Sequence, residues 1–283
     1  MFIALKIMAR LSTIVGLIIF LWLSSISLSS QAPTKLKDNP TLAVSDSGSW
    51  KSVEKGVEFR KMALRRSEPG HSIDLKLLRF DTRRIVPRVL RSAQFQLKGA
   101  NAKTFAEKSG AIATINGSYF DTDGKPLAFL KAGGQVINSR VVKTSFYTGV
   151  FSVKDQQPLI SHRDDFLSEQ ADEGLQSGPL LLRHGTSQAV TGASSRASRR
   201  ALIGIDQERR LIIAATDNLL GGLDWPELQE IFSAASWQIQ VTDLLNLDGG
   251  GSAQLYVKAG NFVELVPGTS EVPVAIGFFN RAP

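Results

Sequence analysis

The sequence predicts an α+β fold, a single domain in which a mixed, largely antiparallel sheet packs with a few helices behind an N-terminal signal or anchor segment. Three observations support this class. Short strand-like runs outnumber helical stretches, and the two kinds do not alternate regularly as they do in a doubly wound sheet. The 283 residues also contain neither an internal repeat nor a second linker.

The first 30 residues are set apart by their charge and hydropathy. Lys6 and Arg10 precede an apolar run over residues 11–23, a serine-rich stretch follows, and no acidic residue interrupts the segment. This order is typical of a signal peptide. The uncharged run also allows a membrane anchor, with membrane contact through residues 11–28 if the segment is not cleaved. Both readings predict an exported protein that is periplasmic, extracellular or membrane-anchored.

Residues 31–55 are polar, contain proline and glycine, and are expected to form a linker, so residues 56–283 are expected to form the domain. The chain has 33 basic and 26 acidic residues, a net charge of +7. Removing residues 1–30 takes away two basic residues and no acidic one, which leaves a scattered surplus of five positive charges. No nucleic-acid-binding motif accompanies this surplus, so it predicts a solvated surface and no nucleic-acid partner.

Composition excludes several kinds of site. The absence of cysteine rules out disulfides, thiolate metal sites, a cysteine nucleophile and a lipidated cysteine. The three histidines, His71, His162 and His184, lack the short spacing of a helical pair. A zinc site built on histidines is therefore not expected, and a histidine-based triad has few candidates.

The first half of the domain reads mainly as strands, because apolar and charged residues alternate between turn-rich stretches. A helix is expected over residues 102–108, because Asn101 suits its N-cap and Gly110 its end. The strands expected before residue 120 are 57–64, 73–80, 93–97 and 111–115.

The second half contains the clearest helix, over residues 225–236, where Asp224 suits the N-cap and Pro226 the first turn. Its apolar stripe predicts core packing. A polar stretch over residues 185–199 is expected to form a loop. The strands expected here are 135–137, 146–153, 180–183, the hairpin 201–205 and 211–216, then 241–247 and two closing strands.

Three segments depart from core patterning, and the first is Asn116-Gly117-Ser118-Tyr119-Phe120-Asp121. An apolar strand brings a carboxamide and a carboxylate to its end, where polar groups can face a cleft. Gly117 permits close approach of the backbone. The alternative is an Asn-Gly turn of a hairpin.

The second segment is Leu245-Asn246-Leu247-Asp248 followed by three glycines and Ser252. Strand alternation puts Asn246 and Asp248 on one side and the two leucines on the other. The N–H groups of Gly249, Gly250 and Gly251 are expected to be uncovered and able to donate hydrogen bonds to a phosphate or oxyanion. The alternative is a flexible glycine turn with a solvated aspartate.

The third segment is Ser198-Arg199-Arg200 at the start of the apolar strand 201–205. A guanidinium at Arg200 can hold a phosphate or carboxylate through two parallel hydrogen bonds. The alternative is an ordinary surface arginine.

Together these segments resemble the phosphodiester glycosidase family, which includes the lysosomal enzyme that uncovers mannose 6-phosphate and a bacterial branch associated with exopolysaccharides. The resemblance covers roughly residues 93–278 and includes the helix before the last motif. Two departures concern Ala201-Leu202 and Asp217-Asn218, where the family has Thr-Ala and Asp-Gly. The segments similar to family motifs are, in order, 115–121, 177–181, 200–204 and 246–252.

The resemblance implies a hydrolase that cleaves a sugar-1-phosphodiester of the envelope or of extracellular glycoconjugates. The leaving phosphate needs electrostatic capture, and the sugar carbon needs a carboxylate. The catalytic candidates are Asp248 first, then Asn116, Asp217 and Asp121. The substrate-binding candidates are Arg200, Asn246, Gly117, Gly178, Gly249, Gly250, Gly251 and Ser252.

No cofactor and no metal ligand are predicted, although the oxygen-rich candidates leave Ca²⁺ or Mg²⁺ open. The expected partner is a sugar phosphodiester or polysaccharide. The competing function is a non-catalytic carbohydrate-binding protein of exopolysaccharide or envelope assembly, which turnover of a sugar phosphodiester would distinguish.

Overall fold

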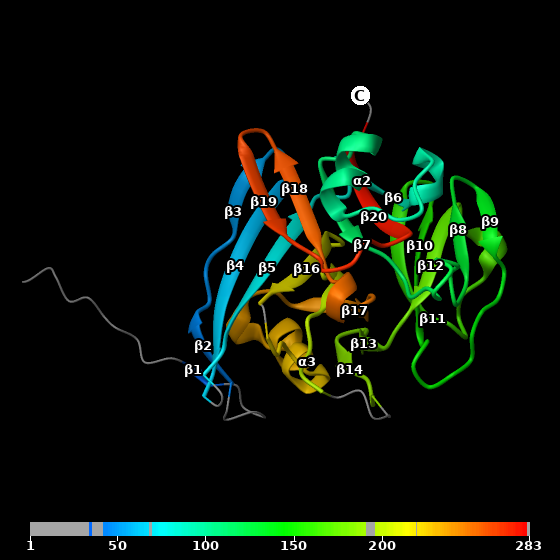
Figure 1. The fold of residues 1–283 in the computed structure, drawn as a ribbon. Coiled ribbons are helices and arrows are strands. Elements are labelled where there is room, and N and C mark those ends of the chain that lie inside the picture. The colour runs from blue at the N-terminus through cyan, green and yellow to red at the C-terminus, as the bar shows by residue number, and fades with distance from the viewer. Residues whose placement is uncertain (1–33, 36–41, 68–69, 191–195, 219, 282–283) are drawn as a thin grey trace, which may run out of the picture. The chain divides into compact units, whose positions relative to one another are not determined.

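Antiparallel strand pairing builds three sheets in the computed structural model, which describes residues 34–35, 42–67, 70–190, 196–218 and 220–281 (Figure 1). One sheet has ten strands and the other two have five each. Every strand pair within the described residues is antiparallel.

The ten-stranded sheet carries the three central strands that lead to the candidate site, β15, β16 and β17. β3 (Lys51–Glu54) pairs with β4 outside the main path. The path runs in the order β1 (Thr34–Lys35), β2 (Leu42–Asp46), β4 (Val57–Arg66), β5 (Ser72–Phe80), β16 (Leu211–Asp217), β15 (Ala201–Asp206), β17 (Val241–Asn246), β13 (Leu180–Arg183) and β14 (Thr186–Ser187).

The two five-stranded sheets each bring one strand end to the same region. One sheet is ordered β11 (Gln157–His162), β10 (Gly149–Lys154), β12 (Glu173–Ser177), β8 (Leu130–Ala132) and β9 (Gln135–Asn138). The other is ordered β19 (Phe262–Val266), β18 (Leu255–Ala259), β7 (Ala113–Asn116), β20 (Val274–Asn280) and β6 (Ile85–Arg91).

Hydrophobic clusters cover both faces of the ten-stranded sheet. Leu245 belongs to a large cluster shared with the two smaller sheets, in which Phe80 and Phe278 stack with ring centroids 4.4 Å apart. Leu244, its neighbour on β17, belongs to a second cluster together with residues of α3 (Trp225–Ser233). Neighbouring residues of β17 thus point to opposite faces, as strand geometry requires.

The helix α3 begins where the sequence predicts. The Asp224 side chain accepts a hydrogen bond from Glu227 N, and the Glu227 side chain accepts one from Asp224 N, which completes a capping box. The helix ends at Ser233 and not at residue 236, because Ala234 adopts extended backbone before the short 3-10 turn η3 (Ala235–Trp237).

The helix α2 (Ala102–Ser109) also follows its prediction. The Asn101 side chain accepts a hydrogen bond from Thr104 N, and Gly110 ends the helix with a left-handed φ of 76°. Three further 3-10 turns are η1 (Ser92–Phe95), η2 (Ser168–Gln170) and η4 (Gly250–Ser252).

The fold class is only partly as predicted. Largely antiparallel strands and a single domain are confirmed, but the sheet structure dominates, with two α-helices in the described ranges, so the class is sheet-rich more than α+β. Nor is the sheet mixed, since its pairs are antiparallel. The strands that the sequence patterns did not indicate include β6, β8, β11 and β12.

Local predictions failed where side chains or pairing partners override the pattern. Residues 93–97 form no strand, because Arg91 N donates to Gln94 Oε1 at 3.0 Å and closes the turn η1. β10 begins at Gly149 and not at residue 146. Three strands close the chain, β18, β19 and β20, where two were expected.

The expected linker over residues 31–55 contains strands of the large sheet. β2 pairs with the C-terminal half of β4 and β3 with its N-terminal half, so polar residues here gain backbone partners that composition alone does not reveal. The predicted signal or anchor over residues 1–30 lies outside the described residues. Among the helices that the structure describes, none is long and apolar enough to cross a membrane.

Candidate active site

The glycine-rich loop after β17 is held by Asn116 at the end of β7. Asn116 Nδ2 donates to Asp248 O at 2.7 Å, and Asn116 Oδ1 accepts from Gln254 N at 3.0 Å. Asn116 is 1% exposed, and both ends of its amide are occupied. Asn116, predicted to be catalytic, is therefore placed as a support for the loop backbone.

Gly117 supports the same loop through its backbone. Gly117 N donates to Val274 O at 2.8 Å, and Gly117 O accepts from Asp248 N at 3.1 Å. A Cβ at this position would lie 2.8 Å from Val274 Cγ1 and 3.1 Å from Val274 O. Any larger residue would push the segment away from β20 and displace Asp248. This clash explains why position 117 is a glycine.

The Asp248 carboxyl group is the strongest chemical candidate. Burial raises its pKa to about 6, against the opposing effect of hydrogen bonds from the Ser252 hydroxyl and the Gly249 N–H. Its side chain is only partly covered, so the group can meet both solvent and a ligand. A carboxyl group of this kind is ionised at neutral pH and can take up a proton just below it.

The glycine loop is less open than the sequence predicts. The Gly249 N–H is directed to the Asp248 carboxylate, and Gly250 N donates to Arg199 O at 2.9 Å. Gly251 O accepts from Thr269 N at 2.9 Å and from Ser270 N at 3.1 Å. The expected three-amide anion site is thus reduced to the N–H of Gly251, and the other glycines serve to shape the loop.

Arg200 lies beside this loop and is almost wholly buried, with 6% of its surface exposed. Its guanidinium carbon lies 3.5 Å from the ring centroid of Trp225, the first residue of α3. Arg200 Nε donates to Leu223 O at 2.9 Å and Nη2 to Arg196 O at 2.7 Å. Nη1 has no hydrogen-bond partner among the described residues.

The free nitrogen of Arg200 faces the glycine loop, since a Cβ built on Gly249 would lie 3.9 Å from Nη1. Burial lowers the pKa of Arg200 to about 10, and Tyr119, Asp224 and Glu227 act in the opposite direction. The side chain therefore remains a cation at neutral pH. A fixed cation beside Gly249 is suited to hold a ligand anion.

Asn246, Tyr119 and Gly178 form a second support under the loop. Asn246 Nδ2 donates to Tyr119 OH at 2.9 Å and to Gly178 O at 2.7 Å, and Tyr119 OH donates to Leu247 O at 3.1 Å. Asn246 is fully buried, and its Oδ1 lacks a partner among the described residues. A Cβ on Gly178 would lie 1.8 Å from Phe146 O, so only glycine fits there.

The other two candidate carboxylates are engaged in structural contacts. Asp217 forms a salt bridge with Lys76 at 2.7 Å. Asp121 Oδ1 accepts from Asp123 N at 2.9 Å and from Lys125 N at 2.8 Å, which closes a turn. None of these contacts is made with the Asp248 loop, and the catalytic roles expected for Asp217 and Asp121 stay predictions.

Sequence reasoning missed three residues of this region, Tyr119, Tyr147 and Gln254. Tyr119 lies inside a motif that was noticed, but its hydroxyl contact with Leu247 O spans 128 positions of the chain. Tyr147 lies in an irregular segment without a motif, and its ring centroid is 5.7 Å from that of Tyr119. Burial raises the pKa of Tyr147, and the charge of Asp248 adds to this effect.

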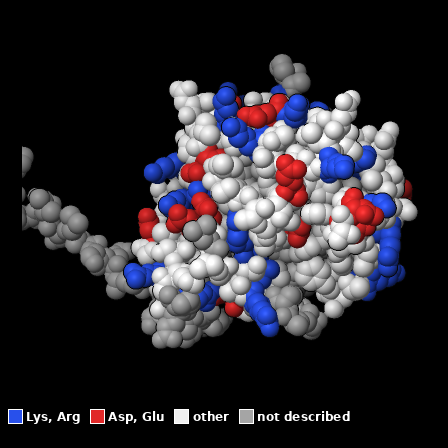
Figure 2. All heavy atoms as spheres, viewed as in Figure 1, with Lys and Arg blue, Asp and Glu red and all other residues white. Residues whose placement is uncertain are grey.

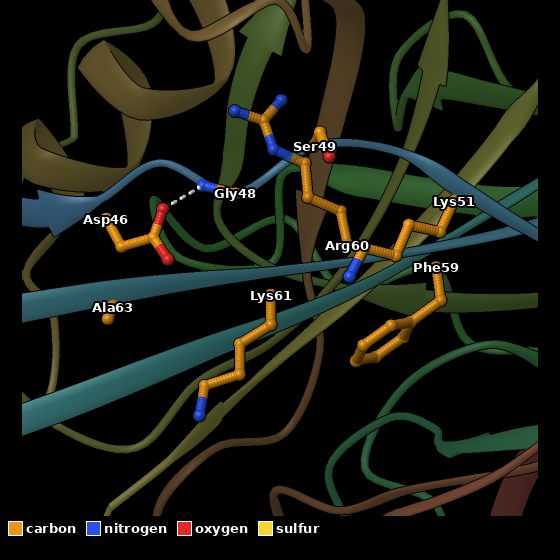
Figure 3. Close-up of a pocket in the computed structure, with 8 residues that line it drawn as sticks. All are labelled: Asp46, Gly48, Ser49, Lys51, Phe59, Arg60, Lys61 and Ala63. Carbon is orange, nitrogen blue, oxygen red and sulfur yellow. Dashed lines mark hydrogen bonds between the residues drawn. The ribbon is translucent and has the colours of Figure 1, made fainter. Parts of the chain in front are cut away.

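The described residues outside this site form no metal cluster, and one pocket lies apart from the predicted site residues. Among the described residues no three His, Asp or Glu side chains lie close enough to hold a metal ion. The pocket in Figure 3, with a volume of ≈ 480 Å³, lies between β4 and the β2–β3 loop, and no predicted site residue lines it. Basic and acidic side chains are interspersed on the face shown in Figure 2, without one dominant basic patch.

The region that contains the candidate site is similar to a known protein family. A family model described as phosphodiester glycosidase matches residues 109–279, more than half of the chain. This range includes β7, Arg200 and the Asp248 loop. No curated protein sequence matches the chain.

Solved structures share the fold at low sequence identity. The catalytic domain of zebrafish N-acetylglucosamine-1-phosphodiester alpha-N-acetylglucosaminidase, auto-inhibited by its pro-peptide, is 16% identical, with a TM-score of 0.60 over 89% of this chain and 87% of its own. A hypothetical protein from Synechocystis is 16% identical, with a TM-score of 0.57 over 84% of this chain and 65% of its own.

Proposed function

The chain belongs to the phosphodiester glycosidase family, and on this premise we propose that it hydrolyses a sugar-1-phosphodiester. The observation that carries the proposal is that Arg200 Nη1, which has no partner among the described residues, lies beside Gly249, the residue that follows the partly covered Asp248. One group suits the sugar carbon and the other suits the phosphate. The substrates that we propose are glycoconjugates of the envelope or the extracellular space.

The reaction breaks the bond between the anomeric carbon and a phosphate oxygen. Water supplies the oxygen that bonds to that carbon and releases one proton to the solvent, and the bonding electrons leave with the phosphate, so the products are a free sugar and a phosphomonoester. The departing phosphate already carries charge and needs a cation more than a proton. Arg200 supplies that cation, because two of its nitrogens are fixed by carbonyls and Nη1 is left for the ligand.

Asp248 serves the sugar carbon, which becomes electron-deficient as the bond to phosphate lengthens. In glycosidases, carboxylates stabilise this oxocarbenium-like centre or activate water. Asp248 acts in its ionised form, and the hydrogen bonds from Ser252 and Gly249 N–H hold that form in place. Asn116 and Asn246 act through the backbone, since their amide nitrogens donate to Asp248 O and Leu247 O respectively.

Turnover of a substrate panel tests this function. The full chain should release free sugar and a phosphomonoester from at least one sugar-1-phosphodiester, measured by reducing-sugar and phosphate analysis. Asp248→Asn should remove this activity, while the matched change Asp121→Asn should keep it, because Asp121 closes a turn. Binding of the sugar phosphodiester without product would contradict the hydrolase and favour a non-catalytic carbohydrate-binding protein.

We further propose that the reaction requires no cofactor, because a cationic side chain and a carboxylate already supply the two charges that the chemistry needs. A chelator such as EDTA should leave the rate of sugar release unchanged. Loss of activity with EDTA, restored by Ca²⁺ or Mg²⁺, would overturn this part of the proposal.

A further inference from the structure

An irregular loop beside the site is held in place from inside the protein. This 139–148 loop connects β9 to β10 and contains no helix or strand. Gln176 of β12 is fully buried beneath it. Gln176 Oε1 accepts from Val142 N at 2.7 Å, and Nε2 donates to Val142 O at 2.7 Å and to Tyr147 O at 2.9 Å. One buried amide thus fixes both ends of a six-residue stretch.

The same loop is fastened to the segment that enters the candidate site. Leu180 N donates to Thr148 Oγ1 at 2.8 Å. Gly178, whose carbonyl accepts from Asn246, packs so closely on Phe146 O that a side chain could not be added. The loop therefore has a defined position relative to the Asp248 loop, although it lacks regular structure.

The aromatic residues of the loop extend to Asp248. The rings of Phe146 and Tyr147 have centroids 5.4 Å apart, and both meet Tyr119 edge to face, at 5.2 Å and 5.7 Å. Tyr119 OH in turn lies 3.1 Å from Leu247 O, one residue before Asp248. Tyr147 is half-buried, and its hydroxyl has no partner among the described residues.

We propose that Tyr147 is the sugar-contacting residue of this site, with Gln176 as the positioning residue that fixes it. This inference rests on the proposed function and extends it, since it assigns the sugar half of the substrate as the phosphate half is assigned to Arg200. A pyranose has an apolar C–H face and a rim of hydroxyls. A tyrosine offers an apolar ring and a polar hydroxyl that match both.

The two ends of the proposed sugar phosphodiester are then recognised by different side chains. Tyr147 contacts the sugar and does not contact the phosphate. Arg200 binds the phosphate and does not contact the sugar. A substrate that lacks one end should therefore be sensitive to only one of the two residues.

Binding to the inactive Asp248→Asn chain tests the inference without turnover. The probes are a hexose-1-(methyl phosphodiester), an aryl hexoside and dimethyl phosphate, with dissociation constants from ligand-observed NMR titration. Tyr147→Ala should weaken the two sugar-containing probes by about tenfold, because it removes the aromatic ring that covers the sugar. Tyr147→Phe should weaken them by about two- to tenfold, as the loss of one hydrogen bond does.

Two controls separate sugar contact from general damage. Tyr256→Phe removes a hydroxyl from β18 and should leave all three dissociation constants unchanged. Dimethyl phosphate should bind the Tyr147 variants as it binds the parent. Unchanged binding of both sugar probes to Tyr147→Ala, at an unchanged Tm, would overturn the inference, as would equal weakening of all three probes.

Failure of the hydrolase and failure of the sugar contact give different results. If the native chain turns over no phosphodiester but binds the sugar probes through Tyr147, the result supports the sugar contact and contradicts the hydrolase function. If turnover occurs and Tyr147→Ala leaves KM and kcat unchanged, the hydrolase stands and the sugar contact falls.

Gln176→Glu tests the positioning role, because it keeps the acceptor for Val142 N and removes the two donated hydrogen bonds. It should raise KM for the sugar phosphodiester and leave kcat within about twofold, because Asp248 and Arg200 are untouched. A lower Tm with an unchanged KM would assign Gln176 a merely structural role.

Discussion

The two ends of strand β15 carry the same types of residue in opposite states. At its C-terminal end, Asp206 is 3% exposed, and its carboxylate accepts from Glu208 N at 3.0 Å, Arg210 N at 2.8 Å and Arg210 Nε at 2.7 Å. At its N-terminal end, Arg200 has one nitrogen, Nη1, without a partner among the described residues, and this nitrogen lies beside Gly249. The preceding residue, Asp248, has a pKa that is raised by burial.

The difference shows that burial of a charge is not by itself a sign of function. Asp206 and Arg210 neutralise each other and complete a hairpin turn, so nothing remains for a ligand. Asp248 and Arg200 are held by main-chain groups and by Ser252, and each keeps capacity for a further partner. Remaining capacity for a hydrogen bond or an ion pair at a fixed position is what distinguishes the candidate-site end of β15.

The largest expected effect is a difference in kcat between two carboxylate substitutions, one at each end of β15. Asp248→Asn should lower kcat by at least about a thousandfold, because it removes the charge that faces the sugar carbon. Asp206→Asn should leave kcat within about twofold and lower the free energy of unfolding by about 1–3 kcal/mol. Steady-state kinetics and urea unfolding measure both. Similar kinetic losses in the two variants would remove the functional distinction between the two ends.

The arginines at the two ends should differ in what they recognise. Arg200→Lys should lower kcat/KM for a sugar phosphodiester about ten- to a hundredfold, because an ammonium keeps the charge but not the planar fork over Trp225. An uncharged aryl glycoside should feel this change far less. Arg210→Lys, as the control, should change neither substrate. Equal losses on both substrates would make Arg200 a structural residue.

The dependence of stability on pH should sharpen the contrast at Asp248. Its folded-state pKa of about 6 exceeds the unfolded value of about 3.9, so the folded state binds more protons between these values. Stability therefore falls as pH rises from 4 to 7, and the cost above pH 7 is about 1–3 kcal/mol. Asp248→Asn should be more stable than the native chain by this amount at pH 8 and equally stable at pH 4. Urea midpoints at both values measure it, and a constant difference would argue against the shifted carboxyl group.

The rate should follow the same ionisation in the opposite sense. If Asp248 acts as a carboxylate, kcat/KM rises with pH through the pKa of about 6. Below that value, kcat/KM should rise about tenfold per pH unit. The control change Asp121→Asn should leave the pH dependence of kcat/KM unchanged. A pH–rate profile that falls through pH 6 would show that the protonated form of Asp248 is the active one.

The sequence predicted the backbone arrangement of the candidate site better than the contacts of its side chains. Strand alternation correctly put Leu245 and Leu247 in one core cluster and Asn246 on the other side. The salt bridge of Asp217 and the turn contacts of Asp121 could not be predicted, because they depend on tertiary pairing and on turn geometry. Tyr147 and Gln176 carry no local signal at all.

The fold was predictable where local rules decide it. The Asp224 cap and the apolar stripe located α3, and the apolar run after Arg200 located β15. Strands β2 and β3 were missed because they are short and partly polar, and their stability comes from pairing with β4. Such strands are specified by a neighbour distant in sequence, not by their own pattern.

The hydrogen bonds that support the Asp248 loop have a consequence for when the candidate site forms during folding. The hydrogen bonds from Asn116 to Asp248 O, from Asn246 to Tyr119 OH and from Asn246 to Gly178 O join residues 132, 127 and 68 positions apart. They draw one strand end or connection from each of the three sheets. Contacts of such sequence separation close late in folding. Recovery of activity during refolding should therefore coincide with the final association of the sheets, and no fragment that lacks one sheet should be active.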